Sequence, residues 1–144
     1  MYIPIWQGGM PAALDLAVTS PQRQAALQLA SVRPGAAAQL YEEHKRTFLQ
    51  TEAQCSAQGV LFLPVVADSS GGWGDTALMV VGKLAKKAEA KDGVPASLHM
   101  SQYLEGLSVV IRRASARAFL RRSGPCQVES LPTAMETAAD ILAI

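Results

Sequence analysis

Alternating hydrophobic and polar positions predict two short strands at the start of the chain. Residues 2–6 (YIPIW) are β-prone, and within residues 12–19 (AALDLAVT) the side chains of Leu14, Leu16 and Val18 fall on one face. Gly8 and Gly9 stand between the two runs, where a tight turn favours glycine. The first twenty residues therefore predict a β-hairpin.

A helical pattern follows the hairpin. We expect a short helix from Pro21 to about Leu29 with Ser20 as its N-cap. A long helix is expected from about Ala36 to Gln58, ending at Gly59. Residues spaced by four, three, four and seven predict its buried apolar stripe, which comprises Ala37, Tyr41, His44, Phe48 and Cys55.

The second half of the chain begins with a nearly continuous apolar run, residues 60–67 (VLFLPVVA). Such a run is typical of a strand buried on both faces, although Pro64 argues against a central position in the sheet. A glycine-rich loop over residues 68–74 follows, with Trp73 packed on the core. Asp75 is expected to cap a helix over about residues 76–91, and a last helix is expected over about residues 96–122.

The predicted order is β-β-α-α-β-α-α. It indicates an α/β (α+β) fold with a small mixed sheet of about three strands covered by helices. We expect one domain over residues 1–122 and a weakly structured tail over residues 123–144.

Composition agrees with a globular domain, because 49% of the residues are hydrophobic and 17% are charged. Cys55 and Cys126 lie far apart, with no spacing typical of a zinc site or of a disulfide framework. No apolar run approaches the roughly 18 residues of a membrane span. These features predict an intracellular, reducing location and no membrane association.

Charge is unevenly distributed, although the formal net charge is only +1. Residues 83–122 carry nine basic and three acidic side chains. Five arginines lie near the end of the last predicted helix: Arg112, Arg113, Arg117, Arg121 and Arg122. A ridge of this kind can contact nucleic-acid phosphates, or it can be an ordinary solvated face. Only Tyr103 and Phe119 accompany it, so base stacking is not indicated.

Asp15 is the first candidate for chemistry. An acid in the middle of a β-prone stretch is disfavoured by propensity, so Asp15 is either solvent-exposed or paired. If a helix covers it, its carboxylate needs a partner, which a metal ion or a lysine would supply.

The second candidate is the segment from Tyr41 to Phe48. Glu43 and Lys45 match the acid-x-Lys half of a metal-dependent nuclease signature, in which carboxylates hold a divalent metal and a lysine orients the attacking water. On a helix these two residues lie about 200° apart, which separates them. The alternative is a solvated helix face with a Glu42–Arg46 pair.

Four segments, taken in order, resemble a known family. They are residues 2–21 with their Gly-Gly turn, the helix segment from Glu42 to Phe48, the apolar strand at residues 62–66, and the Gly-Gly-Trp-Gly turn at residues 71–74. Together with the arginine-rich helix they resemble the restriction-like endonuclease region at the C-terminal end of non-LTR retrotransposon polyproteins.

The resemblance implies a PD-(D/E)XK-type nuclease fold that nicks DNA with Mg²⁺ or Mn²⁺, and a nuclear location. Asp15 would be the second metal-binding carboxylate, and Lys45 would be the catalytic lysine, displaced onto a helix as in this family. Accessory carboxylates would come from Glu42, Glu43 and Glu52. If the Asp15 carboxylate and the Lys45 amine lie within about 10 Å on one side of the sheet, one site can use both.

Two departures from the family pattern lower the expected activity. The family's first acid belongs just upstream of Tyr2, and Phe48 stands where the family usually has tyrosine. We therefore expect a truncated endonuclease-like domain with weak or no cleavage. The alternatives are a non-catalytic nucleic-acid-binding module that uses the arginine-rich helix, and a structural remnant with no activity.

Overall fold

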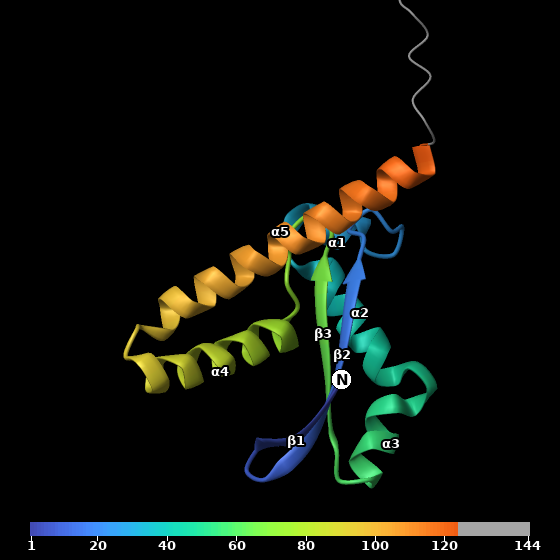
Figure 1. Cartoon of the computed structure of the whole chain (residues 1–144). Coiled ribbons are helices and arrows are strands. Elements are labelled where there is room, and N and C mark those ends of the chain that lie inside the picture. Colours follow the sequence, from blue (N-terminus) through green and yellow to red (C-terminus); the bar gives the residue numbers. More distant parts are fainter. Residues whose placement is uncertain (124–144) are drawn as a thin grey trace, which may run out of the picture.

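The computed structural model describes residues 1–123, which form a three-stranded mixed sheet with helices on both faces (Figure 1). The strands are β1 (Tyr2–Gln7), β2 (Met10–Thr19) and β3 (Leu61–Asp68), and they lie in the order β1-β2-β3. β1 and β2 are antiparallel, whereas β2 and β3 are parallel. The α/β fold and the element order expected from the sequence are confirmed.

The predicted hairpin is present. Gly8 and Gly9 connect β1 to β2 with φ angles of 60° and 80°, which a two-residue turn of this kind requires and which glycine adopts without strain. Parallel strands need a long crossover, and here the segment between β2 and β3 supplies it. That segment contains α1 (Leu27–Val32), α2 (Ala36–Thr47), the short 3₁₀ turn η1 (Phe48–Gln50) and α3 (Thr51–Ala57).

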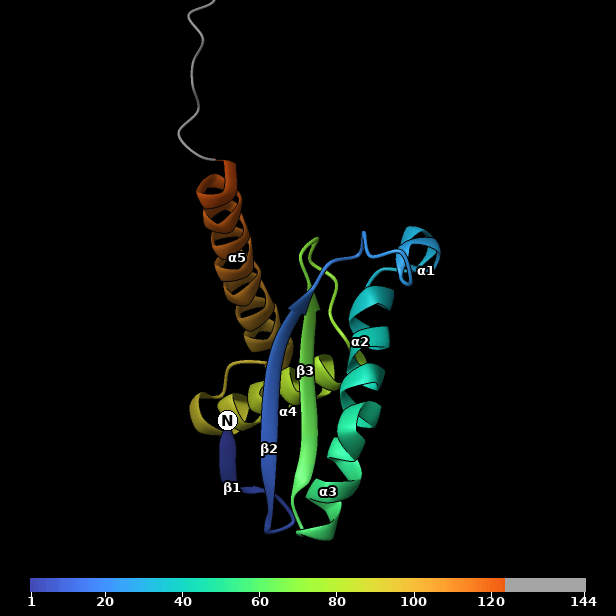
Figure 2. The ribbon, with the colours of Figure 1, turned by 90° about the vertical axis from the view of Figure 1, so that its right-hand side faces the viewer.

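Successive side chains along each strand point to opposite faces of the sheet, and different helices lie on the two faces. Leu14, Leu63 and Val65 point to one face, where they pack with Ala77 and Val80 of α4 (Asp75–Asp92). Asp15 and its parallel partner Pro64 point to the other face, on the side of α2. Figure 2 shows the two long strands between α2 on one side and α5 (Ala96–Ser123) on the other.

β3 is buried on both faces, as its apolar run predicts. It is nevertheless an edge strand, because within residues 1–123 it pairs with β2 alone, apart from a single bridge between Ala67 and Trp73. An edge position accommodates Pro64, which has no N–H to donate to a further strand. Pro64 argues only against a central strand, so it is compatible with the edge position of β3.

The single long helix expected over residues 36–58 is wrong. The helix breaks at Leu49 and Gln50, whose φ angles of 51° and 54° are left-handed, and α3 then starts at Thr51. The expected end of this segment is confirmed, since Gly59 has a φ of 69° and the Val60 N–H donates to the Cys55 carbonyl.

The helix expected over residues 21–29 is also wrong. Residues 21–26 form turns instead, and α1 begins only at Leu27. Ser20 accepts a hydrogen bond from the Gln22 N–H, so it stabilises a turn rather than a helix start.

The expected apolar stripe of α2 is the third correction. Its buried residues are Ala36, Ala37, Ala38 and Glu42, whereas His44 and Phe48 are exposed. Small alanine side chains let α2 approach β3 closely, so the larger aromatic side chains lie on the sides of α2 that face away from the sheet.

α5 packs against α4 at its N-terminal half, and its C-terminal half extends beyond the body of the domain (Figure 1). None of the helices in the described part of the chain is long and apolar enough to cross a membrane. The tail expected beyond residue 123 lies outside the described residues.

Candidate functional site

Asp15 and Lys45 meet on the α2 side of the sheet. The Lys45 Nζ lies 2.9 Å from the Asp15 Oδ2, and the two side chains keep 26% and 37% of their surface exposed. Asp15 comes from the middle of β2, and Lys45 comes from the last turn of α2. The geometric condition for one shared site is therefore met, and the site is open to solvent.

The contact with Asp15 also favours the protonated form of Lys45. The hydrogen bond with Asp15 raises the pKa of Lys45, and this effect outweighs the opposing effect of burial. A raised pKa keeps the ammonium group charged at neutral pH. Lys45 can therefore stabilise an anion such as a phosphate oxygen, but it is a poor general base.

The described residues do not fit a divalent metal ion. Mg²⁺ prefers several oxygen ligands in octahedral order, and Asp15 is the only carboxylate in this pair. Within residues 1–123 no group of three or more His, Cys, Asp and Glu side chains could hold a metal ion. Cleavage chemistry that depends on such an ion needs at least one further acid beside Asp15.

Glu42 has a different environment from the one that a metal ligand requires. Its carboxylate is buried, with 4% of the residue exposed, and it accepts hydrogen bonds from the backbone N–H groups of Thr76 (3.1 Å) and Ala77 (3.2 Å). These donors belong to the first turn of α4, whose own N-cap, Gly74, supplies no side-chain cap. Glu42 thus caps α4 from a neighbouring helix, in place of the expected cap from Asp75.

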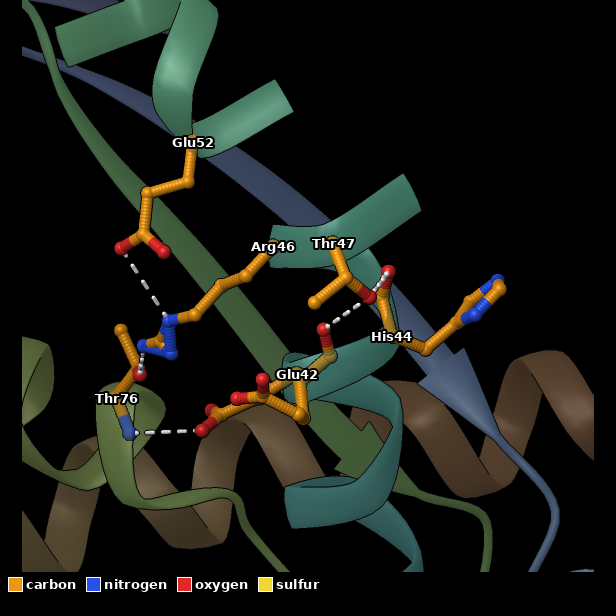
Figure 3. Close-up of polar contacts among 7 residues, drawn as sticks. Glu42, His44, Arg46, Thr47, Glu52 and Thr76 are labelled. Atoms are coloured by element: carbon orange, nitrogen blue, oxygen red, sulfur yellow. Dashed lines mark hydrogen bonds and ion pairs between the residues drawn. The ribbon is translucent and has the colours of Figure 1, made fainter. Parts of the chain in front are cut away.

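The surrounding polar contacts join α2, α3 and α4 past the edge of β3 (Figure 3). Arg46 donates to the Thr76 hydroxyl at 2.6 Å and lies 3.6 Å from the Glu52 carboxylate. The expected Glu42–Arg46 pair is therefore replaced by contacts to other elements. Figure 3 also shows His44 pointing to the opposite side from Arg46.

Glu43 and Glu52 lie apart from the Asp15–Lys45 pair. Glu43 is exposed on α2, about 200° around the helix from Lys45. Glu52, at the start of α3, is held by Arg46. Within residues 1–123, Asp15 forms its ion pair with Lys45 and not with either of these glutamates, so the three accessory glutamates do not surround one centre.

The glycine-rich loop after β3 is organised by Asp68. Its Oδ1 accepts hydrogen bonds from the Ser70 N–H, the Ser70 hydroxyl and the Gly72 N–H, at 2.6–2.9 Å. Burial alone would raise the pKa of Asp68, but these hydrogen bonds outweigh it and lower the pKa below its ordinary value of 3.8. The loop is a structural turn, and Trp73 packs partly buried against the core as expected.

The arginines belong to the C-terminal half of α5, which crosses the end of the sheet where β2 and β3 finish, whereas Asp15 lies in the middle of β2 (Figure 1). Arg113, Arg117 and Arg121 recur every fourth residue along an exposed side of the helix. Arg112 instead donates to the Ser70 carbonyl at 3.0 Å, which ties α5 to the loop after β3. The arginines therefore come from a different part of the fold from the candidate catalytic pair.

An exposed row of aromatic rings was missed by sequence reasoning, which assigned it to the core. Tyr41 stacks on His44 with ring centroids 5.6 Å apart, and the Phe48 ring lies tilted by 41° against His44 with centroids 5.4 Å apart. The signal was the spacing itself, because three rings separated by three and four residues share one side of any helix. Only the packing of α2 decides whether that side faces the core or the solvent.

No family model, curated protein or solved structure matches this chain.

Proposed function

We propose that this chain is a nucleic-acid-binding domain of the restriction-like endonuclease type, with Asp15 and Lys45 at its catalytic centre. The observation that carries the proposal is the 2.9 Å contact between an acid from the middle of a strand and a lysine from a helix. An acid is unusual in the middle of a strand such as β2, and its partner Lys45 stands where the resembled family has its catalytic lysine.

The chemistry available to the pair is limited. A charged lysine beside a partly exposed carboxylate can bind a phosphate oxygen and stabilise negative charge as a phosphodiester bond breaks. One carboxylate supplies too few ligands for the metal ion that the family uses. The domain therefore binds its substrate and cleaves it weakly or not at all.

The register of the hairpin supports this interpretation. Tyr2 pairs with Ala13, and Met1 and Leu14 exchange backbone hydrogen bonds, each of 2.7 Å. A residue placed directly before Met1 would therefore lie opposite Asp15, with its side chain on the same face of the sheet. This is the location at which the family resemblance expects the first acid.

Nicking of supercoiled plasmid tests the proposal, with Mg²⁺, Mn²⁺ or EDTA in the buffer. We expect weak metal-dependent nicking that Asp15→Asn and Lys45→Ala abolish, with Glu43→Gln as the matched control on the exposed side of α2. A chain extended by one aspartate directly before Met1 should nick faster than one extended by asparagine. Nicking that is unchanged in both site variants would overturn the assignment of the catalytic pair.

A second candidate function is duplex binding without cleavage. The observation that favours it is the exposed ridge of Arg113, Arg117 and Arg121 on α5, a different element from those that carry the catalytic pair. This function predicts duplex affinity that persists in EDTA and falls steeply with salt. A chain that binds no nucleic acid even at low salt would contradict both functions and would leave a structural remnant.

A further inference from the structure

The aromatic ladder of α2, defined as Tyr41, His44 and Phe48, has Tyr41 half-buried and its other two rings in solvent. His44 is exposed, and Phe48 keeps 53% of its surface in solvent. Aromatic rings contribute most to the free energy of folding when they are buried, and the rings of this row that lie in solvent do not make that contribution. The row therefore presents a surface suited to a flat, apolar ligand.

The ladder lies next to the catalytic pair. The Lys45 Nζ, which contacts Asp15, lies 5.6 Å from the centroid of the Tyr41 ring. The Arg23 guanidinium lies 5.5 Å from the same centroid. Next to Tyr41 is a hollow of about 210 Å³, whose lining includes Thr19, Arg23 and His44. Cationic groups thus lie at one end of the ladder.

Phe48 forms the other end. Its ring lies tilted by 41° against His44, which in turn stacks on Tyr41. The chain leaves the helix directly after Phe48 through Leu49 and Gln50, in a left-handed conformation that residues other than glycine rarely adopt. This break ends α2 with the Phe48 ring half exposed at the tip of the ladder.

We propose that the aromatic ladder is a stacking platform for an unpaired base of a single-stranded nucleic acid, which rests on the Phe48 ring while a neighbouring phosphate lies near Arg23 and Lys45. The inference rests on the proposed function, because it takes the nucleic acid as the ligand of this site. Phe48 follows the end of α2 that is remote from α5 (Figure 1), so stacking on its ring supplies attraction away from the arginine ridge.

The chemistry favours a single strand over a duplex. Every base has a π face, but in a duplex that face is covered by the next base pair, whereas an unpaired base can stack on an aromatic side chain. Rings 5.4–5.6 Å apart leave no room for a base between them, so the base must stack on the outer face of Phe48.

Fluorescence anisotropy with three labelled probes of equal length tests the proposal. The probes are a single strand of mixed sequence, the same strand with every base removed, and the corresponding duplex. We expect the intact single strand to bind at least about 5-fold more tightly than the abasic strand, because each stacked base contributes about 5-fold to 150-fold in affinity. The abasic strand keeps every phosphate, so it isolates the contribution of the bases.

Substitution of Phe48 provides the decisive comparison. Phe48→Ala and Phe48→Leu should both weaken binding of the intact single strand by about 5-fold or more, and Phe48→Tyr should restore it. Neither Phe48→Ala nor Phe48→Leu should change the affinity for the abasic strand. Leu49→Ala is the matched control, because Leu49 is the next residue and is 72% exposed but has no ring. Thermal melts establish that each variant is folded.

The outcomes separate this inference from the proposed function. Equal affinity for the intact and abasic strands, no binding of either strand, or unchanged binding in Phe48→Leu would overturn the stacking platform, even if nicking still depends on Asp15. Loss of single-strand binding in both Phe48→Ala and Phe48→Leu, with nicking unaffected by Asp15→Asn, would support the platform and overturn the catalytic pair.

Discussion

Replacing Glu42 tests whether this buried acid holds two helices together or serves the catalytic site. Its carboxylate is the acceptor for the Thr76 and Ala77 N–H groups, and both of these residues are buried, with exposed fractions of 5% and 0%. Water cannot easily reach these donors once the carboxylate is removed. Glu42→Ala therefore leaves two backbone N–H groups of α4 without an acceptor.

The expected cost follows from these contacts. A buried donor left unsatisfied costs about 1–3 kcal/mol, and losing a helix cap costs about 0.5–2 kcal/mol. Because the two effects overlap, we expect Glu42→Ala to lower the free energy of unfolding by about 2–4 kcal/mol. At roughly 4 °C per kcal/mol for a domain of this size, Tm falls by roughly 8–16 °C. Glu42→Gln keeps one acceptor oxygen and should lose about half as much.

Urea denaturation followed by circular dichroism measures this loss, with thermal melts as a second measurement. Glu43→Ala is the matched control, since its exposed neighbouring carboxylate has no such partner, and it should change stability by less than about 0.5 kcal/mol. A loss below about 0.5 kcal/mol in Glu42→Ala would refute the capping role. If such a stable variant also lost plasmid nicking, the accessory role implied by the family resemblance would be favoured instead.

Three further predictions concern the loop after β3, the start of α2 and the basic ridge. The lowered pKa of Asp68 stabilises the fold above pH 4 and loses this contribution as the pH falls further, so urea midpoints should fall more steeply from pH 5 to pH 3 in the wild type than in Asp68→Asn. Gly35→Ala should lower the free energy of unfolding by about 1–3 kcal/mol in the same assay. Gly35 has a φ of 79°, and an added Cβ would lie 2.6 Å from the Trp73 carbonyl oxygen. An unchanged urea midpoint would contradict this close approach. If α5 binds duplex DNA, replacing Arg117 and Arg121 together by glutamine should reduce the slope of log K against log salt by about 1.8, and an unchanged slope would remove them from the interface.

The sequence by itself determined the elements whose signals are local. The Gly8-Gly9 turn, the end of the second helical segment at Gly59 and the doubly buried strand β3 follow from backbone preferences and from hydrophobic run length. These preferences act within a few residues, so they hold whatever the chain packs against. The unusual acid at Asp15 and the family-like segment around Lys45 are likewise local features of the sequence.

Tertiary structure decided which side of α2 is buried and what Glu42 does. Hydropathy assigned Tyr41, His44 and Phe48 to the core, but alanines make the close approach of α2 to the sheet. Tyr41 is therefore only half-buried, and His44 and Phe48 are exposed. The partners of Glu42 lie 34 and 35 residues away in sequence, on a helix that the chain reaches only after β3. The periodicity of a single helix contains no information about such partners. The contact between Asp15 and Lys45 is of the same kind, because a strand and a helix 30 residues apart meet only once the crossover folds onto the sheet.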